Sequence, residues 1–159
     1  MSCSDPSTQV NFKNLQEVSD ANFYIVCPPS YCSIKPNEIS PVFPFDMYHL
    51  NIHWQEVVAQ LPRLTIVAED KINLKFTYSQ RSKYFRLPSV INVQLVGIDK
   101  GHSTIAISSQ SKYGYIDFGG NESRVDAWLQ DLIDSVGKQH NLGHSSNADT
   151  SDKARSASK

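Results

Sequence analysis

The sequence has no long uninterrupted run of hydrophobic residues. Its most concentrated apolar segment without a charge, Phe23 to Pro29, is far shorter than the roughly 20 residues of a transmembrane helix. The opening residues, Met1 to Gln9, are polar and contain no apolar stretch after a basic start, so we expect no secretory or mitochondrial leader. These absences predict a chain with no integral membrane segment and a cytoplasmic location.

An excess of charge of one sign is also missing. The 159 residues include 15 Lys and Arg against 16 Asp and Glu, which gives a formal net charge of -1. A molecule with this balance exerts no bulk attraction on nucleic acid, so we expect no nucleic-acid partner. The balance still permits a local patch of charge.

Cysteine is scarce, and its spacing fits no metal or redox motif. The three cysteines are Cys3, Cys27 and Cys32, an odd number in a chain without a recognisable export signal. Cys27 and Cys32 are separated by four residues rather than two, and no second Cys or His pair has zinc-finger spacing. We therefore expect reduced thiols, no structural disulfide, and neither a metal nor another cofactor.

Polar segments lie at both ends of the chain. Residues 139–159 are mostly Ser, Asn, Asp, Lys, His and Ala, a composition that buries too little apolar surface to offset the entropy of ordering. We expect residues 1–11 and 139–159 to be disordered. One domain is expected over residues 12–138.

The domain shows the periodicity of a sheet with two helices. Apolar residues at steps of three and four predict a helix that begins after Asp46 as N-cap and ends at Pro62. The same pattern predicts a second helix from Asn121, as N-cap, to Gly137. Alternating apolar and polar residues, or short β-branched runs, predict strands over 22–27, 64–68, 72–81, 90–98 and 103–110.

Short connections between the later strands, such as Asp99 to Gly101, are typical of an antiparallel meander. Two amphipathic helices then need one apolar face on which to pack. The sequence therefore predicts a two-layer α+β fold, mainly an antiparallel β meander with both helices on one face.

Several separate blocks resemble the family catalogued as domain of unknown function 1499. The main block runs from Ser103 to Val125 and includes Gly-Tyr-Ile-Asp-Phe-Gly-Gly-Asn. Other blocks are similar to proteobacterial members of that family: Asn22 to Pro28 with Tyr31-Cys32, Pro41 to Phe43, Pro62-Arg63, Gln80 to Ser82 and Phe85 to Pro88. This resemblance covers about residues 22–132. It implies no established reaction, ligand or cofactor.

The sequence departs from the family pattern at three positions. Gln110 stands where the family often has Arg, Ile116 where it has Ser, and Gly120 where Val is usual. A family role that needs a basic side chain at position 110 is therefore not carried over to this chain.

The clearest candidate site is the glycine-rich turn before the last helix. A helix N-terminus leaves free backbone N–H groups and the positive end of a dipole, which together favour an anion. Positive side chains concentrate in one other place, the connection between the second and third strands of the meander. The predicted ligand-binding residues are Arg81, Arg86, Tyr113, Asp117, Gly119, Asn121 and Arg124. The alternative is that these residues form a structural network of ion pairs, a helix cap and backbone turns.

We therefore favour a non-enzymatic module that binds an anionic or amphipathic small molecule, or a protein partner. No catalytic residue is assigned. One alternative is a hydrolase or transferase with its catalytic group among Cys27, Cys32, His49 and His53. His49 and His53 are four residues apart on a helix, as zinc ligands often are, but they lack a third ligand at a characteristic spacing. Another alternative is an assembly subunit that pairs through an exposed strand edge.

Overall fold

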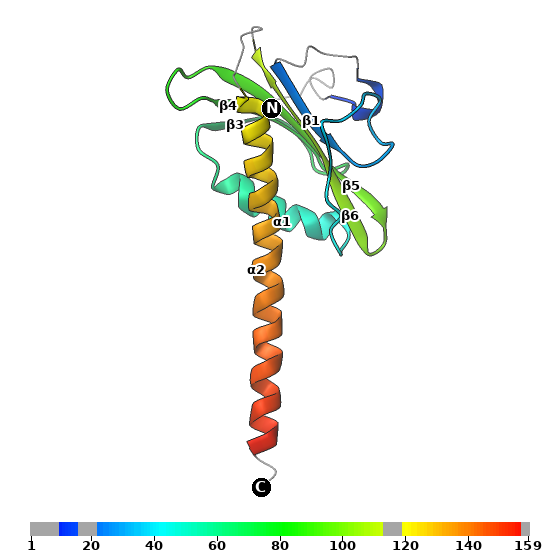
Figure 1. The fold of residues 1–159 in the computed structure, drawn as a ribbon, viewed down its shortest axis with the longest axis vertical. Helices are drawn as coiled ribbons and strands as arrows, with labels where there is room; N and C mark the ends of the chain where they lie inside the picture. The colour runs from blue at the N-terminus through cyan, green and yellow to red at the C-terminus, as the bar shows by residue number, and fades with distance from the viewer. Residues whose placement is uncertain (1–9, 16–21, 113–118, 157–159) are drawn as a thin grey trace.

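The computed structural model describes residues 10–15, 22–112 and 119–156, with side chains up to residue 139. One sheet, two α-helices and a 3-10 turn make up this part of the chain (Figure 1). In chain order, the elements are η2 (Phe12–Asn14), β1 (Phe23–Cys27), β2 (Glu38–Ile39), α1 (Met47–Ala59), β3 (Leu64–Asp70), β4 (Lys75–Arg81), β5 (Pro88–Asp99), β6 (His102–Ser111) and α2 (Gly120–Ser156).

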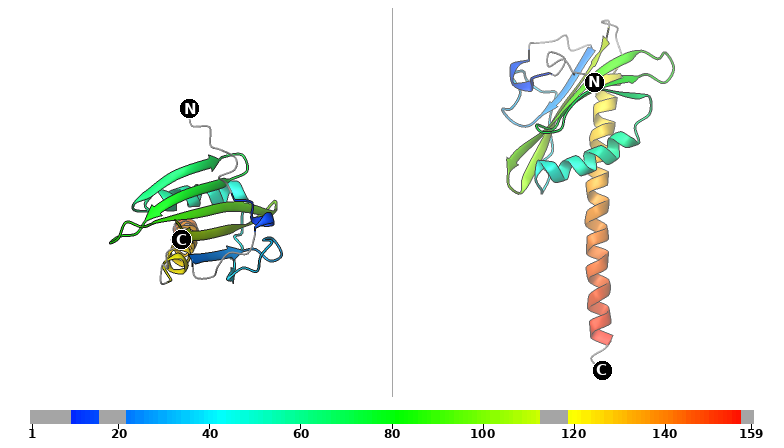
Figure 2. Two further views of the ribbon diagram at one scale, coloured as in Figure 1. Left: turned by 90° about the horizontal axis from the view of Figure 1, so that it is seen from above. Right: turned by 180° about the vertical axis from the view of Figure 1, so that it is seen from behind.

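The six strands form a single sheet in the order β2-β1-β6-β5-β4-β3. Neighbouring strands are antiparallel, except β1 and β2, which run parallel. Strands β3 to β6 follow one another as the predicted meander, and β1 pairs with the free side of β6. Both helices cover the same face of the sheet, as Figure 2 shows from above. The predicted α+β class is confirmed.

The main core lies between this face and the two helices. Phe76 and Tyr78 of β4 stand opposite Val93 and Ile91 of β5, and all four side chains are buried. The indole Nε1 of Trp54, in α1, donates a hydrogen bond of 2.9 Å to the hydroxyl of Tyr78. This bond gives two buried polar groups a partner, so the large aromatic rings can be buried without leaving an unpaired donor.

Helix α1 matches its prediction closely. The carboxylate of Asp46 accepts a hydrogen bond of 2.8 Å from the backbone N–H of His49, which is the expected N-cap contact. The helix ends at Ala59, shortly before Pro62, whose ring cannot continue it.

Strand β4 begins three residues later than predicted. The carboxylate of Asp70 accepts hydrogen bonds from the backbone N–H groups of Ile72 and Asn73, and these bonds form a turn. Ile72 is consequently 80% exposed, although its place in the alternating pattern predicted burial. Local capping by an Asp side chain outweighs hydrophobic periodicity here.

Helix α2 differs from its prediction at both ends. It begins at Gly120, so Asn121 lies inside the first turn and is not the N-cap. It also continues through Gly137 to Ser156, beyond the predicted end. A glycine within a helix costs only about 1 kcal/mol, which the intact backbone hydrogen bonds can offset. The boundary of the folded domain at residue 138 stays a prediction.

A second, smaller core lies on the opposite face of the sheet. Its buried members are Phe12, Ile25, Cys27 and Ala106. A disulfide joins Cys27 to Cys32, so the prediction of reduced thiols at these positions is wrong. The turn after β1 brings the two Cα atoms to 6.2 Å, a separation that a disulfide can bridge and that spacing along the chain could not reveal.

Candidate functional site

The hairpin that joins β4 to β5 carries most of the positive charge at one end of the sheet. Arg81 pairs with Pro88 at the last register position, and residues 82–87 form the connection. Arg63, just before β3, lies beside Arg81, because their backbones share a hydrogen bond of 3.4 Å. We define Arg63, Arg81, Lys83 and Arg86 as the basic cluster. All four are exposed.

The basic cluster has no compensating acidic residues near it in sequence. Neither residues 60–68 nor residues 79–98 contain an Asp or a Glu. Within the described residues, none of its four side chains has a carboxylate at ion-pair distance. The net charge of the whole chain therefore hides a local concentration of four positive charges.

Two guanidinium groups of the cluster are held by backbone carbonyls. Arg63 Nε donates to the carbonyl of Arg81 at 3.0 Å, and Arg81 Nη1 donates to the carbonyl of Arg86 at 2.8 Å. A guanidinium has five N–H donors, so most remain available after one such bond. The arginines are therefore oriented while they keep donors for a ligand.

Backbone conformation sets two of these arginines apart. Arg63 and Arg86 both have φ of 54°, in the left-handed region that glycine adopts most easily. A non-glycine residue there costs roughly 1–2 kcal/mol. Strained positions of this kind concentrate at functional sites, where a side chain is retained in spite of the cost.

The hairpin also presents exposed aromatic rings. Tyr84 and Phe85 are each 82% exposed, and Leu87 is 39% exposed. The tip is closed by a hydrogen bond of 3.0 Å from Ser82 N–H to the carbonyl of Leu87, and by another of 3.0 Å from Leu87 N–H to Ser82 Oγ. The two rings therefore stand on a short, well-closed loop. In Figure 1 this loop is the green hairpin that projects from the sheet.

A buried polar network connects this end of the sheet to the start of α2. Arg124 donates from Nε to Gln80 Oε1 at 2.7 Å and from Nη1 to Ser109 Oγ at 3.0 Å. Asn121 accepts from Ser109 Oγ at 2.7 Å and donates to Ser111 Oγ and the carbonyl of Asn22. We call these side chains (Gln80, Ser109, Ser111, Asn121 and Arg124) the α2 network. They fix the start of α2 on the sheet.

The structure therefore brings together part of the predicted site. Arg124 contacts Gln80, the residue before Arg81, so the start of α2 and the β4–β5 hairpin do lie at the same end of the sheet. Asn121 belongs to the buried network, and Gly119 precedes the helix with φ of 84°. Tyr113 and Asp117 lie outside the described residues. Sequence reasoning missed Arg63, Tyr84 and Phe85, although Pro62-Arg63 and Phe85 belong to the blocks quoted for the family.

Acidic side chains in the first turns of α2 lie toward the β1 edge of the sheet, away from β4. Burial, and then the charges of Asp126, Glu38 and Glu122, raise the pKa of Tyr24 above its ordinary value. Tyr24 belongs to β1, which is separated from β4 by β6 and β5. The negative charges in the first turns of α2 therefore act on Tyr24 of β1. Arg124, in contrast, contacts Gln80 of β4.

Carboxylates at the opposite end of the sheet, in contrast, have partners. A side-chain hydrogen bond from Asn73 lowers the pKa of Asp70. The backbone N–H of Gly101, and then the His102 ring, lower the pKa of Asp99. The two ends of the sheet thus differ: the basic cluster at the hairpin end has no carboxylate partner among the described residues, whereas Asp70 and Asp99 at the turn end are hydrogen-bonded to neighbouring residues.

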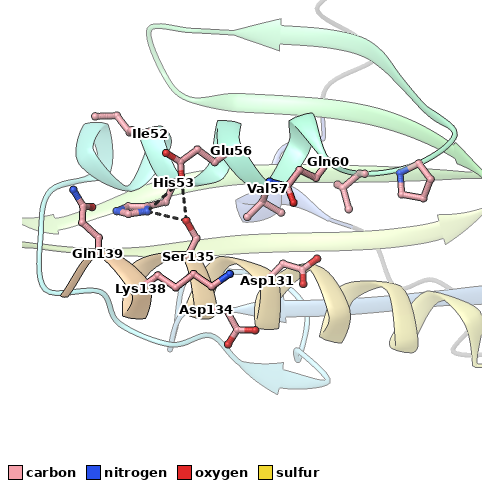
Figure 3. A pocket seen from close by; sticks show the side chains of 12 residues that line it. Ile52, His53, Glu56, Val57, Gln60, Asp131, Asp134, Ser135, Lys138 and Gln139 are labelled. Atoms are coloured by element: carbon pink, nitrogen blue, oxygen red, sulfur yellow. Dashed lines mark hydrogen bonds and ion pairs between the residues drawn. The ribbon is translucent and has the colours of Figure 1, made fainter. Parts of the chain in front are cut away.

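A second candidate is the cleft between α1 and α2, of about 600 Å³ (Figure 3). Buried His53 lines it, and His53 Nδ1 lies 3.0 Å from Ser135 Oγ. Ser135 Oγ donates to Glu56 Oε2 at 3.1 Å, and Glu56 also lies 4.0 Å from the same His53 nitrogen. The other lining residues include Val57, Leu61, Asp131, Asp134 and Lys138.

This arrangement differs from a catalytic triad. In a triad, the serine and the carboxylate bind opposite nitrogens of the imidazole. Here Ser135 and Glu56 both face Nδ1 of His53, so the carboxylate cannot orient the ring toward the serine. His49 and His53 stack with ring centroids 5.6 Å apart, and the described residues contain no group of three or more His, Cys, Asp or Glu side chains suited to a metal.

Residues 4–132 match the family described as protein of unknown function DUF1499. The chain belongs to this family. The match confirms the resemblance that the sequence blocks suggested. Comparison with curated proteins gives no match for this DUF1499 member, and neither does comparison with solved structures. Among the described helices, none is long and apolar enough to cross a membrane.

Proposed function

We propose that this DUF1499 protein is a non-enzymatic module that binds an anionic, amphipathic ligand at the β4–β5 hairpin. The observation that carries the proposal is the basic cluster, four exposed cations with no carboxylate partner in the described part of the chain. A cluster of like charges is unfavourable on its own, and an anion relieves that repulsion.

The chemistry of the hairpin matches both halves of an amphipathic ligand. Guanidinium groups bind phosphate or carboxylate with two parallel hydrogen bonds, and Arg81 and Arg63 are already oriented by backbone carbonyls. Tyr84 and Phe85 offer exposed apolar surface immediately between the cations Lys83 and Arg86. An anionic head with an alkyl or aromatic body would contact both.

Calorimetric titration with hexyl phosphate tests the proposal, with hexyltrimethylammonium as a probe of opposite charge. The proposal expects binding of the phosphate only. Arg81→Gln with Arg86→Gln should weaken that binding at least about ten-fold, since even one charged hydrogen bond contributes about 1.5–3 kcal/mol. Lys71→Gln with Lys100→Gln, two exposed cations at the opposite end, is the matched control and should change it less than about two-fold.

Equal weakening by both double variants would show that net charge alone governs the interaction, and would overturn the assignment of the hairpin. Binding of both amphiphiles with similar affinity would overturn it as well, because it would show a merely apolar site.

The two alternative functions receive less support. The enzyme hypothesis places His53 in the α1–α2 cleft, but the serine and the carboxylate share one ring nitrogen there. For strand-edge assembly, β3 is the longer edge strand, and its pairing register shifts between Ile66 and Ala68. Such an irregularity bends an edge and disfavours pairing with another chain.

A further inference from the structure

The β4–β5 hairpin combines cations and apolar side chains in the way that peripheral membrane-binding loops do. Tyr84 and Phe85, at the tip, are among the most exposed large apolar side chains in the described residues. Aromatic rings with this exposure favour the boundary between lipid headgroups and acyl chains. Cations beside them are attracted to the negative surface potential of anionic lipids.

We infer that the amphipathic anion bound by this protein is the surface of an anionic phospholipid bilayer, which Tyr84 and Phe85 enter while the basic cluster contacts phosphate groups. This inference rests on the proposed function. Charge complementarity selects the occupant: none of the four cations of the basic cluster has a carboxylate partner among the described residues, and residues 79–98 contain no acidic residue that would repel the lipid surface.

The shape of the molecule allows this contact. The hairpin projects beyond the body of the sheet in both side views, and the C-terminal end of α2 lies at the far end of the molecule's long axis (Figures 1 and 2). The tip can therefore reach a flat surface without a clash from α2. A convex, closed loop suits a planar bilayer better than a single strand of nucleic acid, which binds along a positively charged groove with stacking platforms.

Rigid closure of the tip adds to the argument. The bonds between Ser82 and Leu87, and that between Arg81 and the Arg86 carbonyl, hold the loop before any ligand arrives. The backbone of the tip therefore needs little further ordering on binding.

Co-sedimentation of the full chain with vesicles tests the inference. Vesicles of mixed phosphatidylcholine and phosphatidylglycerol should retain the protein, and pure phosphatidylcholine vesicles should not. Tyr84→Ser with Phe85→Ser should lower the partition coefficient at least about ten-fold, because two aromatic side chains lose their burial. Retention should also fall as salt is raised.

Tyr48→Ser with Ile72→Ser is the matched control, because it removes an exposed aromatic and an exposed aliphatic side chain elsewhere (58% and 80% exposed). The control should bind like the unaltered protein. Loss of binding in the control, or retention of binding in the hairpin variant, would overturn the inference.

Fluorescence gives a readout that does not depend on loss of binding. The natural tryptophans, Trp54 and Trp128, are buried, so a Phe85→Trp variant adds the exposed indole. Anionic vesicles should shift its emission to shorter wavelength. No shift in the presence of bound vesicles would place the tip outside the bilayer and overturn the inference.

The two experiments separate failure of the bilayer inference from failure of the proposed binding site. Hexyl phosphate binding without vesicle binding would overturn the bilayer and leave the proposed function standing. Loss of both would overturn both. Tight binding of a single-stranded oligonucleotide that displaces the vesicles would replace the bilayer with nucleic acid.

Discussion

At the scale of single residues, Arg86 occupies a backbone conformation that its side chain disfavours. Its φ of 54° places it in the left-handed region, and its carbonyl accepts the bond from Arg81. Asparagine adopts this conformation more readily and keeps the carbonyl. Arg86→Asn should therefore raise the free energy of unfolding by about 0.5–1 kcal/mol in a urea titration, while it weakens hexyl phosphate binding several-fold.

If Arg86→Asn bound hexyl phosphate more tightly and had a lower free energy of unfolding, this account of Arg86 would be contradicted. Lys100→Asn is a suitable control, because Lys100 is also an exposed cation in a hairpin connection.

Arg124 illustrates a residue whose hydrogen bonds within the protein predict a contribution to stability. Its guanidinium bonds to Gln80, Ser109 and Asn121, all of which are buried within the α2 network. Arg124→Met removes the donors and leaves buried acceptors unpaired, so the free energy of unfolding should fall by about 2–3 kcal/mol. Thermal and urea unfolding measure this. Lys138→Met, at an exposed position of the same helix, should cost less than about 0.5 kcal/mol.

Buried tyrosines predict a loss of stability at high pH. Burial raises the pKa of Tyr78, and burial with nearby carboxylates raises that of Tyr24. The folded state therefore holds these protons more tightly than the unfolded state, whose tyrosines titrate near pH 10. Stability should be unaffected below about pH 10 and fall as pH rises further.

Absorbance of tyrosinate, followed together with circular dichroism, checks this prediction. A fraction of the absorbance should appear only as the native signal is lost. Complete titration of all tyrosines while the native signal persists would contradict it.

At the scale of elements, the turn after β1 is closed by a disulfide. The bond from Cys27 to Cys32 spans a sequence separation of 5 and closes the smaller core around Phe12. Closure of so short a loop contributes about 2 kcal/mol in the chain-entropy description. A reducing agent should lower the free energy of unfolding by about that amount. Cys32→Ser should have the same effect and should abolish further sensitivity to the reductant.

Cys3 provides the control, since a Cys3→Ser variant should retain the full response to reduction. No change in stability on reduction of the unaltered protein would contradict the contribution assigned to the disulfide.

The elements also show why the sequence predicted some features and not others. Asp46 and Pro62 predicted the two ends of α1 correctly, because N-capping and the interruption of a helix by proline act over only a few residues. The late start of β4 depends on Asp70, whose side chain competes with strand pairing. The disulfide and the α2 network could not be predicted in the same way, since they depend on distances between residues that are set by the whole fold.

The candidate site shows the same division. Arg81 and Arg86 could be predicted because a run of cations is visible in the sequence. Arg63 could not be placed with them, because only the pairing of β3 with β4 brings it beside Arg81. Asn121 was assigned a capping role from its position, whereas it lies in the first turn of α2 and its side chain bonds to Ser109 and Ser111 of β6.

At the scale of the whole molecule, the balance of charge is uneven although the net charge is -1. The basic cluster stands at the hairpin end of the sheet, and carboxylates such as Asp70 and Asp99 stand at the other. The two helices and the sheet hold this separation fixed. Under the proposed function, an anion approaches the hairpin end of the sheet.

The most direct test of this claim is to map hexyl phosphate binding residue by residue with two-dimensional NMR of the ¹⁵N-labelled protein. We predict that the largest shift changes fall on the amides of residues 81–87, on the amide of Arg63, and on the Nε resonances of Arg63, Arg81 and Arg86. Changes centred on His53, Glu56 and Ser135 would assign the ligand to the α1–α2 cleft and contradict the account.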